Sequence, residues 1–97
     1  MPSVNFTVKW PNGQQYGYYS PSTIVYEYFQ KGQSFPADQF LAQAQQALQA
    51  ASERVRARYG FACTSALESW QRIQQQAQQF DMTASENIEI TDIYNID

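Results

Sequence analysis

Apolar and polar residues alternate with a period of two in the first ten positions. The apolar side chains at every second position are Val4, Phe6, Val8 and Trp10. This alternation predicts a strand with one buried face. The residues Pro-Asn-Gly at 11–13 then favour a type I turn with a glycine bulge, so a hairpin is expected to lead into a second strand over residues 15–19.

Two longer segments have a helical period. The first, residues 36–59, begins at Pro36 and ends before Gly60, a residue suited to a left-handed cap. Its apolar stripe consists of Phe40, Ala44, Leu48, Ala51, Val55 and Tyr59. The second helix ends near Phe80, and its start is open between Ala62 and Ser65.

Two shorter segments have weaker patterns. Ser20 and Pro21 favour a short helix over residues 21–29, although the β-branched residues that follow them favour a strand. Near the C-terminus, Ile88 and Ile90 alternate with polar residues, which predicts a last strand. Ile93 is out of phase with them, so a bulge or fraying is expected near Asp92.

These elements predict a single α+β domain over residues 1–97. The expected architecture is a three-stranded sheet, made of the hairpin and the C-terminal strand, packed against two long helices. The expected chain order is β-β-α(short)-α-α-β. The first strand is the most apolar, which places it centrally in the order 2-1-3. Two helices of similar length return the chain to its starting side, which predicts that the third strand is parallel to the first.

Composition excludes several classes of protein. The 97 residues carry a net charge of −3, one cysteine and no histidine, so no disulfide within the chain, imidazole base or histidine metal site is available. The weak acidity disfavours nucleic acid as a partner, and no apolar run is long enough to span a membrane. A cytoplasmic location is expected. No metal or cofactor motif is present, so none is predicted.

Charge is segregated along the chain. Four of the six basic residues are Arg54, Arg56, Arg58 and Arg72. Residues 81–97 form an acidic C-terminal segment without a basic residue. Partial fraying of this segment is compatible with the sequence. We favour pairing of this segment with the arginines of its own fold over the docking of a partner there.

Cys63 lies near a helix start, shortly after three arginines. Such surroundings stabilise a thiolate, so Cys63 is a candidate nucleophile or ligand-binding group. Arg54 and Arg58, one turn apart, are candidates for holding a carboxylate or phosphate. For Cys63 burial in the core is the favoured interpretation, because cysteine is among the most often buried residues and no imidazole is available as its base. For the arginines surface pairing is favoured, because such pairs are commonly plain surface contacts.

Aromatic residues are concentrated in the first third of the chain. Part of this set must belong to the core, and the rest favours an exposed surface for protein contact. The tyrosines of this candidate interaction surface are Tyr16, Tyr18, Tyr19, Tyr26 and Tyr28. The many glutamines fall between apolar positions of the long helices, which favours a solvated face, with glutamine-mediated assembly as the alternative.

Residues 51–63, Ala-Ser-Glu-Arg-Val-Arg-Ala-Arg-Tyr-Gly-Phe-Ala-Cys, resemble the central signature of a small family of nitrogen-starvation response proteins. Residues 6–13, 19–22 and 35–40 are also similar to that family, and the resemblance covers most of residues 4–80. It implies a bacterial protein encoded in a gene cluster with a nitrilase and linked to nitrogen limitation or to nitrile or cyanide use. It implies no reaction and no catalytic residue.

Two functions are therefore expected as alternatives. The first is a non-catalytic accessory or adaptor protein that contacts a protein encoded in the same gene cluster. The second is the binding of an anionic or nitrile-derived metabolite, or a thiol-dependent activity, centred on Cys63, Arg54 and Arg58. Enzymatic activity is the less favoured of the two, because the sequence lacks the usual acid–base groups. A homodimer, formed through the aromatic face or the third strand, is compatible with either function.

Overall fold

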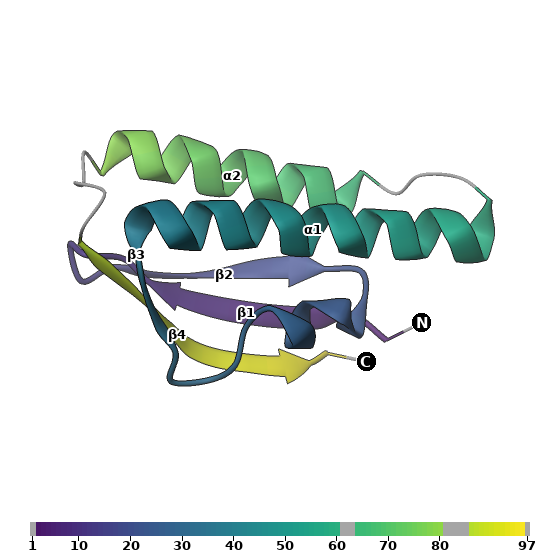
Figure 1. Cartoon of the computed structure of the whole chain (residues 1–97), viewed down its shortest axis with the longest axis horizontal. Coiled ribbons are helices and arrows are strands. Elements are labelled where there is room, and N and C mark those ends of the chain that lie inside the picture. The colour runs from purple at the N-terminus through teal and green to yellow at the C-terminus, as the bar shows by residue number, and fades with distance from the viewer. Residues whose placement is uncertain (1, 61–63, 81–85, 97) are drawn as a thin grey trace.

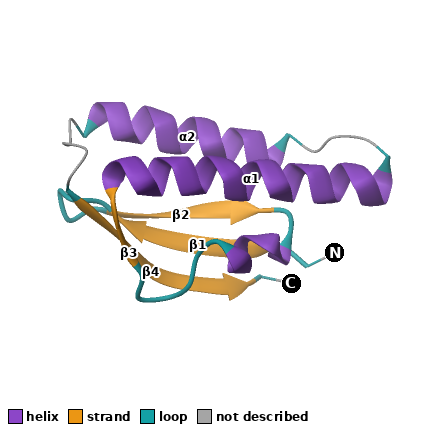
Figure 2. Cartoon of the chain, in the orientation of Figure 1, coloured by secondary structure: helices purple, strands orange, loops and turns teal. Residues whose placement is uncertain are grey.

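The computed structural model describes residues 2–60, 64–80 and 86–96. Its strands are β1 (Val4–Lys9), β2 (Gln15–Ser20), β3 (Ser34–Pro36) and β4 (Asn87–Asn95). Its helices are the short 3-10 helix η1 (Thr23–Glu27) and the α-helices α1 (Ala37–Tyr59) and α2 (Ser65–Gln79). The two α-helices lie side by side over one face of the sheet and leave the other face uncovered (Figures 1 and 2).

Within the described residues the sheet has four strands, in the order β2-β1-β4-β3 with antiparallel neighbours. The prediction of a three-stranded sheet is therefore wrong. The missed strand, β3, has three residues and ends in Pro36, so it contains no alternating pattern that a sequence could reveal. It pairs with the start of β4, where Phe35 lies opposite Ile88.

The direction of the C-terminal strand also differs from the prediction, because β4 runs antiparallel to β1. The prediction assumed that the first long helix starts at the end of the sheet where the hairpin finishes. Instead, residues 28–36 carry the chain back along the sheet before α1 begins (Figure 1). This extra passage reverses the direction of every later element, so β4 enters the sheet from the opposite end.

The hairpin and the bulge follow the sequence pattern. Gly13 has a φ of +89°, and its N–H donates to the Trp10 carbonyl at 2.8 Å, as the predicted turn requires. In β4, Ile90 lies opposite Val8 and Asp92 lies opposite Thr7, so one extra residue bulges between them. The bulge brings Ile93 against the core face from which its phase would otherwise exclude it.

The helix α1 spans Ala37–Tyr59, so it starts one residue after the predicted start and ends at the predicted end; Pro36 is its N-cap and Gly60 its C-cap. The N–H of Gly60, at a φ of +80°, donates to the Arg56 carbonyl at 2.8 Å. Its apolar stripe packs on the sheet, with Phe40 fully buried. The last turns of α1 extend past the sheet (Figure 1), which is why Tyr59, at the end of the predicted stripe, is 48% exposed.

The predicted helix over residues 21–29 is only the five-residue η1. Its N-cap is Ser22, whose side chain accepts from the N–H of Ile24 at 3.2 Å. The β-branched residues at 23–25 lose side-chain freedom in an α-helix, which disfavours a longer helix here. Val25 is fully buried.

Candidate functional site

The structure describes only part of the predicted site around Cys63, Arg54 and Arg58. Cys63 lies outside the described residues. Arg54 and Arg58 are exposed on the last turns of α1. The guanidinium carbon of Arg58 lies 5.9 Å from the centroid of the Tyr59 ring, a cation–π distance.

The tyrosines of the predicted interaction surface occupy separate places. Tyr18 is fully buried, and Tyr16 stacks on Phe80 with ring centroids 6.0 Å apart. Tyr26 donates to the Asn95 side-chain oxygen at 2.7 Å, next to the end of β4. Tyr28 is half-buried against the core. Sequence proximity therefore does not bring these rings into one patch.

Tyr19 is the most exposed of the five. It lies on the uncovered face of the sheet, because its neighbours Tyr18 and Ser20 in β2 point into the core. Its hydroxyl hydrogen-bonds the Ser3 hydroxyl at 2.9 Å. On the same face, Asn5 Nδ2 donates to the Tyr94 hydroxyl at 3.4 Å.

The hydroxyl of Tyr18 holds a buried polar network together. It accepts from the indole N–H of Trp10 at 3.0 Å and donates to Gln76 Oε1 of α2. The guanidinium carbon of Arg72 lies 5.2 Å from the centroid of the Tyr18 ring. Burial raises the pKa of Tyr18 to about 12, although the bond from Trp10 and the charge of Arg72 oppose the shift. A neutral phenol with both neighbours satisfied is a structural group rather than a proton donor.

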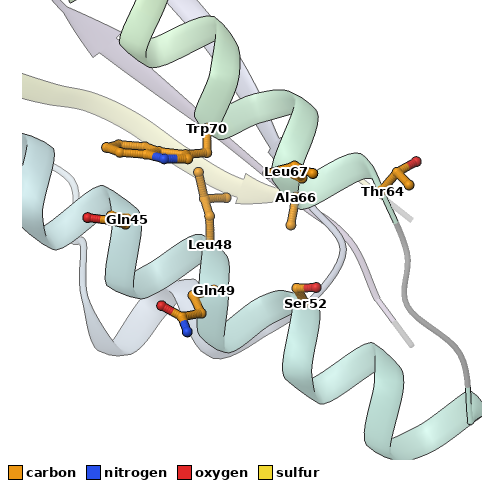
Figure 3. A pocket seen from close by; sticks show the side chains of 8 residues that line it. All are labelled: Gln45, Leu48, Gln49, Ser52, Thr64, Ala66, Leu67 and Trp70. Atoms are coloured by element: carbon orange, nitrogen blue, oxygen red, sulfur yellow. The ribbon is translucent and has the colours of Figure 1, made fainter.

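A groove lies between α1 and α2. Its volume is about 420 Å³ (Figure 3). Its lining residues are Gln45, Leu48, Gln49, Ser52, Thr64, Ala66, Leu67 and Trp70. A second hollow of about 320 Å³ shares Gln45 and Trp70 with it and continues towards Leu41 and Ala77. We call the two hollows together the α1–α2 groove.

The floor of the α1–α2 groove is apolar. The side chains of Leu48 and Trp70 point toward one another across it, and Leu67 lies beside them (Figure 3). Leu67 is 53% exposed, the highest exposure of any large hydrophobic side chain in the described residues. Ala66 and Ser52 are small, which lets the helices approach at the end of the groove near the α2 start.

The rim of the groove carries no charge. Gln45 and Gln49 lie on the α1 side, and Gln74 and Gln78 lie on the α2 side. All four are exposed. Between Asp38 and the glutamate at 53, fourteen consecutive residues of α1 have neutral side chains. Solvated helix faces of soluble proteins normally carry interspersed charges, whereas the cores of protein interfaces are depleted of them.

Sequence reasoning did not find this groove. It assigned the glutamines to a solvated face and the apolar residues of both helices to the core. The available signal was the absence of charge from α1 between 39 and 52, which suits a contact surface better than a solvated one. In the described ranges, no group of three or more acidic or thiol side chains is placed to hold a metal ion.

A family model described as nitrogen starvation-induced protein NitG matches residues 5–93. The chain belongs to the NitG family. This confirms the resemblance to a family of nitrogen-starvation response proteins, and the match includes every residue that lines the α1–α2 groove. No curated protein and no solved structure matches the chain significantly. Among the helices of the described ranges, none has the length and apolar character that a membrane crossing requires.

Proposed function

We propose that this NitG-family member is a non-catalytic accessory protein of the nitrogen-starvation response that acts through protein–protein contact at the α1–α2 groove. The groove lining is uncharged and takes the apolar side chains of a helical surface. The partner in this contact is a protein encoded in the same nitrilase gene cluster. The observation that carries the proposal is the exposed apolar floor, centred on Leu67 and Trp70, within a rim of amides.

The shape of the groove supports a helix as its occupant. The two hollows follow one another along α1 and α2 and share Gln45 and Trp70, so the groove is elongated. An amphipathic helix places apolar side chains every three or four residues along such a groove. Leu41 and Leu48 are spaced seven residues apart on α1, two turns of helix, which matches the anchors of a helix lying alongside.

The chemistry of the lining supports a protein rather than an anionic metabolite. No cationic side chain lines either hollow, and the polar groups available are amides and hydroxyls. Arg54 lies on the opposite side of α1 from Gln45, because nine residues of helix turn the side chain through about half a circle. Its guanidinium is therefore not directed into the groove.

The test is direct binding of the purified protein to each enzyme encoded beside it in the gene cluster, measured by biolayer interferometry at micromolar concentration. At least one enzyme is expected to bind. Leu67→Glu is expected to weaken that binding about tenfold or more, because it places a charge on the apolar floor.

The matched control is Ile96→Glu. Ile96 is 47% exposed, close to the 53% of Leu67, and lies beyond the end of β4 rather than in the groove. The control is expected to bind within about twofold of the wild type. The proposal is overturned if no cluster enzyme binds, or if Leu67→Glu and Ile96→Glu bind equally well.

A further inference from the structure

The exposed face of α1 beside the groove carries one charged residue towards each end of the helix. Asp38 and Arg56 are exposed, one in the first turn of α1 and one in the last. They are eighteen residues apart, which is five full turns at 3.6 residues per turn, so their side chains leave the helix in the same direction. Gln45 and Gln49 lie between them, each within about 20° of that direction.

This pattern is antisymmetric about its midpoint. The midpoint of Asp38 and Arg56 is position 47, and the midpoint of Gln45 and Gln49 is the same position. One end of the stripe is acidic, the other is basic, and the amides between them are both donors and acceptors. A stripe of this kind is complementary to itself when a second copy is turned end to end.

From this complementarity we infer that the α1–α2 groove also binds the helix layer of a second copy of the chain. The two copies are related by a two-fold axis that passes between the two α1 helices, perpendicular to them, at the level of position 47, so that the two helices are antiparallel. Asp38 of each copy then lies opposite Arg56 of the other, and Gln45 lies opposite Gln49. This is an isologous interface, in which one patch contacts itself.

The apolar floor completes the interface. Leu67 and Trp70 stand beside the stripe on α2, and the two-fold axis brings a second pair of the same residues to the other side of the contact. Large apolar side chains at the centre with paired charges at the ends are the usual anatomy of a protein interface. Because few large apolar side chains carry the contact, a dissociation constant on the order of 10 μM is expected.

The inference rests on the proposed function in one respect, since both use the α1–α2 groove. Because the groove accepts one helical surface at a time, the second copy and a cluster enzyme compete for it. The surface differs from the aromatic face and from the last strand, the two positions that the sequence suggested for a homodimer.

The first test is analytical ultracentrifugation of the full chain from 1 to 200 μM, about a tenth to twenty times the expected constant. A concentration-dependent dimer is expected for the wild type and for Ile96→Glu, and a monomer for Leu67→Glu at the highest concentration. Circular dichroism of each variant checks that the fold is retained. A wild-type monomer throughout this range overturns the inference, as does a Leu67→Glu dimer of unchanged affinity.

The second test uses charge reversal. Asp38→Arg and Arg56→Asp each place like charges at both ends of the antiparallel stripe, so each variant alone is expected to dimerise about tenfold more weakly. An equimolar mixture of the two variants regains opposite charges at both ends, and it is expected to dimerise as tightly as the wild type. If each variant alone weakens the dimer and their mixture does not restore it, the antiparallel arrangement is wrong.

The two proposals fail in different experiments. A wild-type homodimer with the expected charge dependence, together with no binding of any cluster enzyme, removes the accessory role and leaves the dimer. A monomer that binds a cluster enzyme through Leu67 removes the dimer and leaves the accessory role, with that enzyme supplying the helical surface.

Discussion

The indole N–H of Trp10 donates a hydrogen bond of 3.0 Å to the hydroxyl of Tyr18, and both side chains are buried. Trp10 directly follows β1 and Tyr18 lies in β2, so the pair joins the two sides of the N-terminal hairpin. The Tyr18 hydroxyl donates onward to Gln76, so this pair connects the sheet to α2. The helix layer that carries the α1–α2 groove is therefore fastened to the sheet by a polar network within an apolar core.

Tyr18→Phe is expected to lower the free energy of unfolding by about 2 kcal/mol, because the Trp10 N–H and the Gln76 carbonyl lose their shared buried partner. Urea unfolding followed by circular dichroism measures the change. Tyr19→Phe is the control, since its hydroxyl is exposed and bonds only at the surface to Ser3. It is expected to cost less than about 0.5 kcal/mol. Equal costs for the two variants would contradict the network.

Stability is expected to fall between pH 10 and pH 12. Burial raises the pKa of Tyr18 from 10.0 to about 12, so in this range the unfolded chain loses the phenolic proton that the folded chain retains. The contribution of the neutral Tyr18 side chain to the free energy of unfolding is complete below pH 10 and is lost as the pH rises through 12. Melting temperatures measured from pH 8 to 12 are expected to fall more steeply for the wild type than for Tyr18→Phe. Parallel curves would show that another group controls the transition.

Gly17 and Asn5 are expected to be energetically coupled across the uncovered face of the sheet. A Cβ at Gly17 would lie 3.1 Å from both Nδ2 and Oδ1 of Asn5. Gly17→Ala therefore displaces the Asn5 side chain in the wild type, which offsets the gain from replacing a strand glycine. In an Asn5→Ala background the same change is expected to stabilise by about 0.5–1 kcal/mol. A double-mutant cycle by urea unfolding measures the coupling, and identical effects in both backgrounds would rule it out.

Deletion of Thr91 is expected to be tolerated. Thr91 is the extra residue of the β4 bulge, and its removal leaves Asp92 opposite Thr7 and Ile93 opposite Phe6. The loss is limited to the bonds of the Thr91 hydroxyl, so the free energy of unfolding is expected to fall by less than about 1.5 kcal/mol.

Deletion of Ile93 is the matched comparison for the Thr91 deletion, because both remove one residue from β4. It moves Tyr94 to the position of Ile93 against the core, and it is expected to cost more than about 3 kcal/mol. Thermal melts of the two deletion variants check the order. A Thr91 deletion that unfolds as readily as the Ile93 deletion would contradict the assignment of the bulge.

Local patterns were enough to predict the elements whose ends depend on nearby residues. The alternation of residues 4–10, the turn at Gly13 and the cap at Gly60 each depend on steric preferences within a few positions. The bulge near Asp92 could also be predicted, because a strand has a strict period of two and Ile93 breaks it. The short strand β3 has no such signal, since three residues ending in proline are ordered by their partner Ile88 rather than by their own pattern.

The candidate site shows the same division. The sequence by itself determined that the chain has two amphipathic helices, an α+β composition without histidine chemistry, and a helix face rich in glutamine. Only the tertiary structure decided that the tyrosines separate, that β4 runs antiparallel to β1, and that Leu67 and Trp70 border an open groove. A periodic pattern shows which residues of a helix share a face, but the number of passages the chain makes across the sheet decides what that face meets.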